Sequence, residues 1–313
     1  MQILQIIVQS AHLLVIGVGV GLPLLAVPLN RKLIKFTDEE HRDALWTFTI
    51  NLIRHAFILI LFGSLLGLGL AGVLWSEDYH ERCHLVMTKF KWAGVEWLVS
   101  MLILLTVYLH GKRHYGGKRS FWIRAIALSV GSFNLLYHLP ILFIVIGAIP
   151  EQQVSYLTEV GQELSRESFN TLAHSSESLS RWIHACLALL AAASAYVAVI
   201  AIRVANQYAG GIQRDSAISV CRWSARNMLI LLFCQLAVGT WTVIAMPADR
   251  TQDLLGGDLL PTTMLAAGLI LLFVQLQQWT GLIGQRVRRS DLVRAVATFI
   301  TMFCCMVAVS VLT

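Results

Sequence analysis

The sequence has little charge for its length. Of its 313 residues, 13% are Asp, Glu, Lys or Arg, whereas 57% are hydrophobic. Soluble domains carry about 25% charged residues, so a water-soluble globular fold is excluded. Long polar stretches are also missing, because the longest segment between hydrophobic runs, 149–181, has only about 30 residues. These absences predict an integral membrane protein without a soluble domain.

Several functional motifs are missing as well. The sequence has no C-x-x-C-H motif, so the chain is not expected to attach a haem covalently. It has no Walker or dinucleotide-binding motif in the required setting. Of six cysteines, only Cys83 falls on the expected outer side, so no internal disulfide is predicted. The first hydrophobic run lacks a basic start and a cleavage site, and is expected to stay as a helix.

Eight hydrophobic runs are long enough to cross a bilayer, which takes about 20 apolar residues. They lack the short alternation of barrel strands, so they predict an all-α integral membrane protein of about eight transmembrane helices. The expected spans are residues 4–29, 46–74, 93–110, 121–148, 182–202, 227–246, 262–282 and 295–312.

Lysine and arginine are distributed unevenly between the loops. One alternating set of loops, 30–45, 110–124, 203–226 and 283–294, holds 17 of the 24, and the other set holds 6. Since basic loops stay in the cytoplasm, both termini are expected to be extracytoplasmic. The net charge of +6 is thus explained by topology, and no nucleic-acid partner is expected.

Ionisable side chains inside a membrane are costly, so each one is a candidate functional residue. The candidates within the expected spans are His12, Arg54, His55, Glu96, His138 and His184. All but Arg54 and His55 fall in the outer half of the membrane, and Met264 lies at nearly the depth of His184. His/Met ligation from two helices at one depth is an electron-transfer haem pattern. An interfacial histidine and a core-packing methionine are the alternative.

Helix-length patterns run along most of the chain. They are "SAHLLVIGVGVGLPLLAV" with His12, "LFGSLLGLGLAGVLW", "WAGVEWLVSMLILLTVYLHGKR" with Glu96, "GSFNLL", "RWIHACLALLAAASAYV" with His184 and "PTTMLAAGLILLF" with Met264. In this order and spacing they resemble helices 1 to 5 and 7 of subunit I of the cytochrome bd quinol oxidases. The resemblance implies a bacterial cytoplasmic membrane protein.

The resemblance also implies a set of haem ligands. His184 and Met264 would hold a low-spin haem b, and His12 would ligate a second haem, with His138 or Glu96 as its other ligand. Alternatively, His138 bonds a backbone carbonyl freed by Pro140. The implied organisation is a first four-helix bundle over 1–148, an extracytoplasmic loop over 149–181 and a second four-helix bundle over 182–313.

The sequence departs from the family pattern in three ways. The second membrane glutamate of the family falls near Leu104, and the quinol-binding loop between helices 6 and 7 is reduced to "PADRTQDLLGGDLLP". A ninth helix, which supplies a haem ligand in the family, is not found. A complete quinol oxidase is therefore not expected, and neither is haem d.

Three functions are compatible with these patterns. The favoured one is a haem-b electron-transfer subunit that passes electrons between an extracytoplasmic partner and a quinone or second haem. Its partners would be other membrane subunits and a c-type cytochrome or iron–sulfur subunit. The alternatives are a divergent terminal oxidase and a non-redox scaffold. Arg54 and His55 could neutralise a haem propionate, reach cytoplasmic phosphates or line a quinone or proton site.

Overall fold

The computed structural model describes residues 2–33, 39–113, 118–284 and 287–312, and within these ranges the regular structure is entirely helical. The helices are α1 (Gln2–Leu33), α2 (Glu39–Val73), α3 (Glu77–His84), α4 (Met87–Arg113), α5 (Lys118–Ala148), α6 (Glu151–Glu159), α7 (Arg166–Ala173), α8 (Ser176–Ala205), α9 (Ile212–Ala245), α10 (Ala248–Gln252), the π-helix η1 (Asp253–Gly257), α11 (Leu259–Gly284) and α12 (Arg289–Leu312).

Eight helices of the described chain are long and apolar enough to span a membrane. They are α1, α2, α4, α5, α8, α9, α11 and α12, and they contain the eight predicted spans to within one residue. The prediction of an all-α, multi-pass membrane protein is confirmed at this level.

Two of the spanning helices are longer than their apolar segments. Helix α9 has 34 residues and α2 has 35, so each is about 50 Å long at 1.5 Å per residue, whereas the hydrocarbon core is about 30 Å thick. The predicted sixth span began at residue 227, but α9 begins at Ile212. The additional turns of α9 contain Arg214, Arg222 and Arg226, and they continue the helix because helical hydrogen bonding does not stop at the membrane surface.

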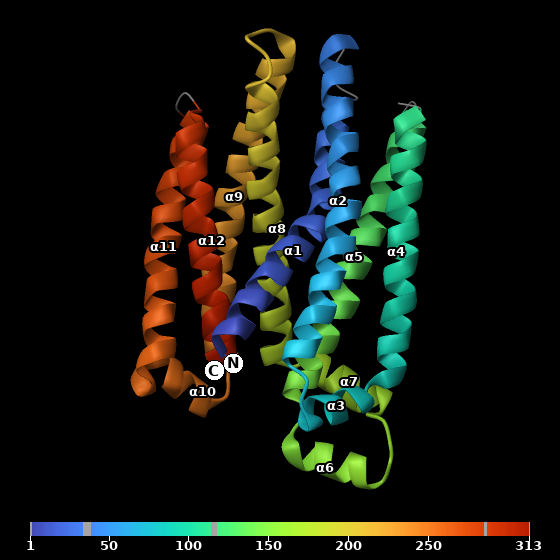
Figure 1. The fold of residues 1–313 in the computed structure, drawn as a ribbon, viewed down its shortest axis with the longest axis vertical. Coiled ribbons are helices and arrows are strands. Elements are labelled where there is room, and N and C mark those ends of the chain that lie inside the picture. Colours follow the sequence, from blue (N-terminus) through green and yellow to red (C-terminus); the bar gives the residue numbers. More distant parts are fainter. Residues whose placement is uncertain (1, 34–38, 114–117, 285–286, 313) are drawn as a thin grey trace.

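The short helices gather at one end of the molecule. Figure 1 shows α3, α6, α7 and α10 at its lower end, together with both chain termini. The segment 149–181, predicted as a loop, contains α6, α7 and the first turns of α8. The loops at the opposite end are the ones rich in Lys and Arg.

The four spanning helices of each half pack in the same order. In the first half α1 packs along α2, α4 along α5, and α2 touches α4; in the second half α8 packs along α9, α11 along α12, and α9 touches α11. Helix α1 crosses obliquely between the halves and packs on α8 (Figure 1). The fourth spanning helix of the first half, α5, contacts α8, the first of the second half; α12, the fourth of the second half, contacts α1 in the corresponding way. The packing has the pattern of a twofold repeat.

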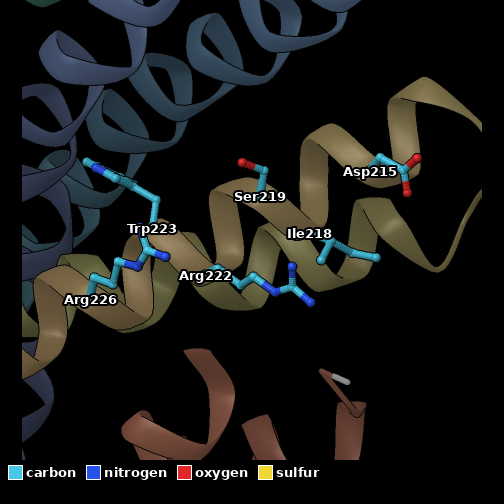
Figure 2. A pocket seen from close by; sticks show the side chains of 6 residues that line it. All are labelled: Asp215, Ile218, Ser219, Arg222, Trp223 and Arg226. Carbon is cyan, nitrogen blue, oxygen red and sulfur yellow. The ribbon is translucent and has the colours of Figure 1, made fainter. Parts of the chain in front are cut away.

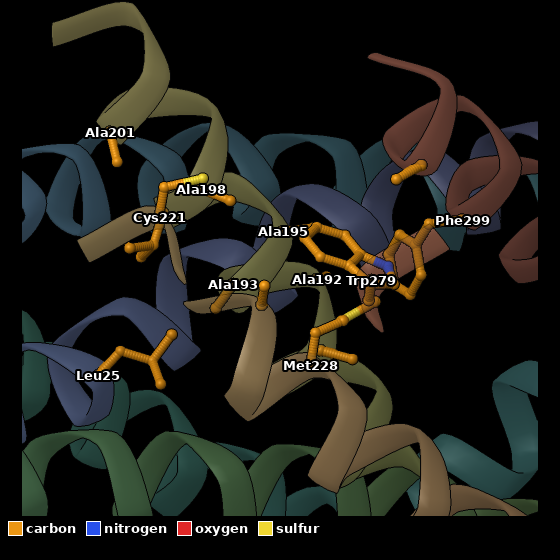
Figure 3. Close-up of a cluster of buried hydrophobic side chains, with 14 of the residues drawn as sticks. Leu25, Ala192, Ala193, Ala195, Ala198, Ala201, Cys221, Met228, Trp279 and Phe299 are labelled. Atoms are coloured by element: carbon orange, nitrogen blue, oxygen red, sulfur yellow. The ribbon is translucent and has the colours of Figure 1, made fainter. Parts of the chain in front are cut away.

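Small residues, Gly17 and Gly21 among them, allow α1 and α8 to approach closely. A Cβ on Gly17 would lie 2.5 Å from Leu189 Cδ2, and one on Gly21 would lie 2.6 Å from Ala193 Cβ. Alanines of α8 then pack against α9, α11 and α12 in the main core (Figure 3). Van der Waals packing of small residues is the main attraction between helices in lipid, and here it fixes the junction of the two halves.

The repeat also holds at the level of sequence register. The number of residues from Leu33, which ends α1, to Ala205, which ends α8, equals the number from Val73, which ends α2, to Ala245, which ends α9. The same interval separates the first residues of α4 and α11. The fourth helices contain the related segments "KRSFWIRAIA" (118–127) and "RRSDLVRAVA" (288–297), at nearly this separation. Residues separated by this interval, called repeat equivalents below, therefore occupy corresponding places in the two halves.

Candidate functional site

His12 of α1 is oriented by the backbone of α2. Its Nδ1 lies 2.9 Å from the carbonyl oxygen of Gly63. Because a carbonyl only accepts, Nδ1 carries the proton, and Nε2 of the neutral ring keeps a free lone pair. The ring lies over Gly67, where a Cβ would come within 2.8 Å of His12 Cε1. Glycine at 67 thus makes room for the imidazole, in addition to any role in helix packing.

His184 of α8 lies against α9 in the same way. A Cβ on Gly239 would come within 3.2 Å of His184 Cε1 and 3.5 Å of its Nδ1. The Nδ1 atom is buried, and among the residues that the structure describes it has no hydrogen-bond partner. A buried polar atom without a partner costs about 1–3 kcal/mol of folding free energy, so the placement of this imidazole destabilises the fold.

The two histidines occupy equivalent positions of the repeat. His12 and His184 are repeat equivalents, and so are Gly67 and Gly239. The histidine–glycine contact is therefore present once in each half, at the start of the first and the end of the second spanning helix. The sequence predicted His12 and His184 on the first helix of each bundle, but not the glycine that lies against each ring.

His138 of α5 and Glu96 of α4 lie side by side. His138 Nδ1 lies 2.9 Å from Glu96 Oε2, although within the described residues Oε2 has no partner with hydrogen-bond geometry. The side chains are 40% and 30% exposed. These were the two candidates for the second ligand opposite His12. Their pairing leaves Nε2 of His138 free and gives Glu96 the place of its orienting partner.

A polar network fixes the position of Glu96 relative to α5. Asn134 Nδ2 donates to the Glu96 carbonyl and to Ser100 Oγ, each at 2.9 Å. Ser100 Oγ in turn donates to the same Glu96 carbonyl. Two helices are thereby joined next to this pair of side chains, which stabilises the relative placement of Glu96 and His138.

The carbonyl freed by Pro140 is not bonded by His138. Pro140 has no N–H, so the carbonyl of Leu136, four residues before it, has no helical partner. Trp182 Nε1 donates to this carbonyl at 2.8 Å, and its ring meets Tyr137 edge-on at 5.4 Å. The alternative expectation for His138 is therefore wrong. Trp182 thus connects α8 to α5.

Met264 is the sixth residue of α11 and is half-buried. Helix α11 packs against α9 and α12, and His184 faces α9 through Gly239, so α9 is a neighbour of His184 and of the helix that carries Met264. In the repeat register Met264 corresponds to Trp92, whereas Glu96 corresponds to Gly268. The pairing of Met264 with His184 stays a prediction.

Arg54 and His55 of α2 lie toward the opposite end of the molecule. His55 Nδ1 is 3.4 Å from the hydroxyl of Tyr196 on α8, and the two rings meet edge-on. Arg54 is exposed. His55 thus belongs to the contact between α2 and α8, and Arg54 faces the surroundings.

A pocket on α9 lies toward the same end. Its volume is about 470 Å³, and Figure 2 shows its lining residues, Asp215, Ile218, Ser219, Arg222, Trp223 and Arg226. Arg226 is the repeat equivalent of Arg54. The sequence prediction missed this pocket, because residues 203–226 were assigned to a loop. Its guanidinium groups are suited to anions.

Comparison with known proteins gives no relative: no family model and no curated protein matches this sequence.

Proposed function

We propose that the chain is a haem-b electron-transfer subunit of a membrane respiratory complex. One observation carries the proposal: His12 and His184 stand at equivalent positions of the repeat, inside apolar helices, each against a glycine of the following helix. Polar groups within a membrane are expensive, and imidazole is a common haem ligand. The resemblance to cytochrome bd subunit I supports the same assignment.

In the second half, His184 and Met264 would hold the haem. The glycine beneath the ring of His184 fits an imidazole that holds a group outside the protein chain, although within the described residues its Nδ1 lacks the orienting partner that His12 has. Met264 supplies a soft thioether on a helix that starts from the same side as α8. His/Met ligation raises the reduction potential of a haem.

In the first half, His12 and His138 would be the ligands. Nδ1 of His12 bonds the Gly63 carbonyl, and Nδ1 of His138 lies beside Glu96 Oε2, so both Nε2 atoms would remain for iron. Metal-bound histidines usually donate their second N–H to a carbonyl or a carboxylate. Glu96 is then a positioning residue that increases the basicity of His138, and not itself the ligand.

Haem b supplies one-electron transfer when it is bound. The residues of the chain would orient the ligands. The four candidate ligands lie nearer to the end of the molecule that carries α3, α6, α7 and α10. The basic loops favour a cytoplasmic position for the opposite end. A c-type cytochrome or iron–sulfur subunit would dock on the extracytoplasmic side, and a quinone or second haem would be the other partner. The location is a bacterial cytoplasmic membrane.

Reduced-minus-oxidised spectroscopy of the purified chain, with and without carbon monoxide, separates this function from the alternatives. A low-spin b-type α-band that carbon monoxide does not change is expected, together with no oxygen consumption from reduced quinone. A carbon monoxide-reactive band with cyanide-sensitive turnover near an ordinary enzyme's ~10 per second would indicate a terminal oxidase. The absence of a Soret band from a chain produced with haem available would indicate a scaffold.

A further inference from the structure

A second pair of histidines lies outside the spanning helices, on α3 (Glu77–His84). His80 and His84 are one helical turn apart and both exposed. Their Nε2 atoms face each other at 3.2 Å, and the ring centroids are 4.5 Å apart. Residues four apart on a helix share a face, but exposed rings need not converge, because each could bond water equally well.

The separation of the two nitrogens matches the spacing of two ligands on one metal ion. With Zn–N bonds of about 2.0–2.1 Å and tetrahedral angles, two ligand nitrogens lie about 3.3–3.4 Å apart; at right angles the spacing falls to about 2.9 Å. The observed 3.2 Å lies between these values. A metal would therefore need only a small adjustment of either ring.

The neighbouring residues hold α3 in place without using these rings. Ser76 caps the helix by accepting from the Tyr79 N–H at 3.1 Å. Arg82 bonds Asp78 at 2.8 Å on one side and the Ile149 carbonyl at 2.8 Å on the other. It also pairs with Glu151 at the start of α6. The helix is thus fixed to α6, and the two imidazoles lie side by side on its exposed face.

We propose that His80 and His84 form a binding site for a divalent first-row transition metal, Zn²⁺ or Cu²⁺. Imidazole nitrogen suits these ions, and Cu²⁺ binds such donors most tightly. Glu77 and Glu81 share the helical face with the two histidines and add favourable negative charge. In the part of the chain that the structure describes, no group of three or more His, Cys, Asp or Glu side chains is placed to hold a metal. Water therefore completes the coordination.

This site is independent of the proposed haem function. It is tested with the purified full chain, freed of metal with a chelator and titrated with Cu²⁺. Electron paramagnetic resonance should show one Cu²⁺ per chain coupled to two imidazole nitrogens. Trp75, whose ring centroid is 5.2 Å from that of His80, should lose fluorescence as Cu²⁺ binds.

The matched control is His174→Gln. His174 is an exposed histidine of the same end of the molecule, and its Nδ1 bonds the Asn170 carbonyl. Loss of an outer-shell partner alone costs about 10–100-fold in metal affinity, so His80→Gln and His84→Gln should each weaken binding at least tenfold, and His174→Gln should not. Zn²⁺ should displace the bound Cu²⁺ when in excess.

Equal Cu²⁺ affinity in the wild type and the His80→Gln/His84→Gln double variant would overturn the proposal. So would a spectrum without coupling to two nitrogens, or no saturable binding by the wild type. Neither substitution removes a buried group, and unfolding measurements on both variants separate loss of the site from loss of the fold.

Discussion

Glu96 on α4 places its Oε2 2.9 Å from Nδ1 of His138 on α5, inside the membrane-spanning part of the molecule. The pairing changes the expected roles of both residues. As separate candidates they competed for the position opposite His12; as a pair, one orients the other. The assignment of His138 as the ligand and Glu96 as its positioning partner follows from which ring nitrogen is engaged.

Glu96→Gln tests this division of roles. The amide keeps the shape of the side chain but removes the charge, so His138 becomes a weaker base and the first-half haem should shift to a higher reduction potential while staying low-spin. His138→Leu should instead convert that haem to high-spin. Redox titration with optical detection measures both. If Glu96→Gln gives the high-spin spectrum and His138→Leu leaves it low-spin, the roles are reversed.

Gly67→Ala should disturb the His12 ring. The new Cβ would lie 2.8 Å from Cε1, a distance that requires the imidazole to move away from α2 and from the Gly63 carbonyl. Reduced haem occupancy of the first half is expected, measured as haem per chain. Gly69→Ala is the control, because nothing lies within 4 Å of its added Cβ. Equal haem content in the two variants would contradict the account.

Gly239→Ala should have a smaller effect on the second half. Its Cβ would lie 3.2 Å from His184 Cε1, so a shift of a few tenths of an ångström relieves the contact. The expected result is a displaced α-band with haem retained. Complete loss of that haem, with the chain still folded, would show that the ring cannot give way.

Trp182→Phe should destabilise the junction of the halves. It leaves the Leu136 carbonyl with only the Cys186 thiol at 3.8 Å, a weak donor. Leaving a buried acceptor unsatisfied costs about 1–3 kcal/mol, to be measured as the free energy of unfolding in mixed micelles. Trp92→Phe, at a tryptophan that is 64% exposed, should stay within about 0.5 kcal/mol of the wild type. Similar losses from both would remove any special role of Trp182.

The number and extent of the spanning helices could be predicted from the sequence, because about 20 consecutive apolar residues have few alternatives to a membrane helix. It also pointed to the histidines of the spanning helices, because ionisable side chains in a membrane are costly. It could not show which neighbour each polar group would choose. The Leu136 carbonyl could have taken His138 or Trp182, and both fitted the sequence. Likewise, His80 and His84 lay in a predicted loop, and their alignment depends on α3 being helical.

Alkylation of Cys83 should depend on pH in a defined direction. Burial raises the pKa of the Cys83 thiol, against a lowering by the hydrogen bond from Tyr79, whose own pKa burial raises to about 12. Since the thiolate is the nucleophile, Cys83 should react more slowly than in the unfolded chain near pH 8, and its rate should still rise above pH 9. Tyr79→Phe removes the lowering contribution and should slow the reaction further. A folded-state rate that levels off at the same pH as the unfolded rate would contradict this.

The most direct test of the account is the haem content of the single histidine variants, measured by pyridine haemochrome assay on the purified chain. The account predicts two b-type haems per chain, one after His12→Ala, one after His184→Ala, and none in the double variant. Met264→Leu should keep two haems but lower the potential of one or make it high-spin. A folded wild-type chain without haem, or two haems retained in both single variants, would contradict the central claim that these equivalent histidines are the haem ligands.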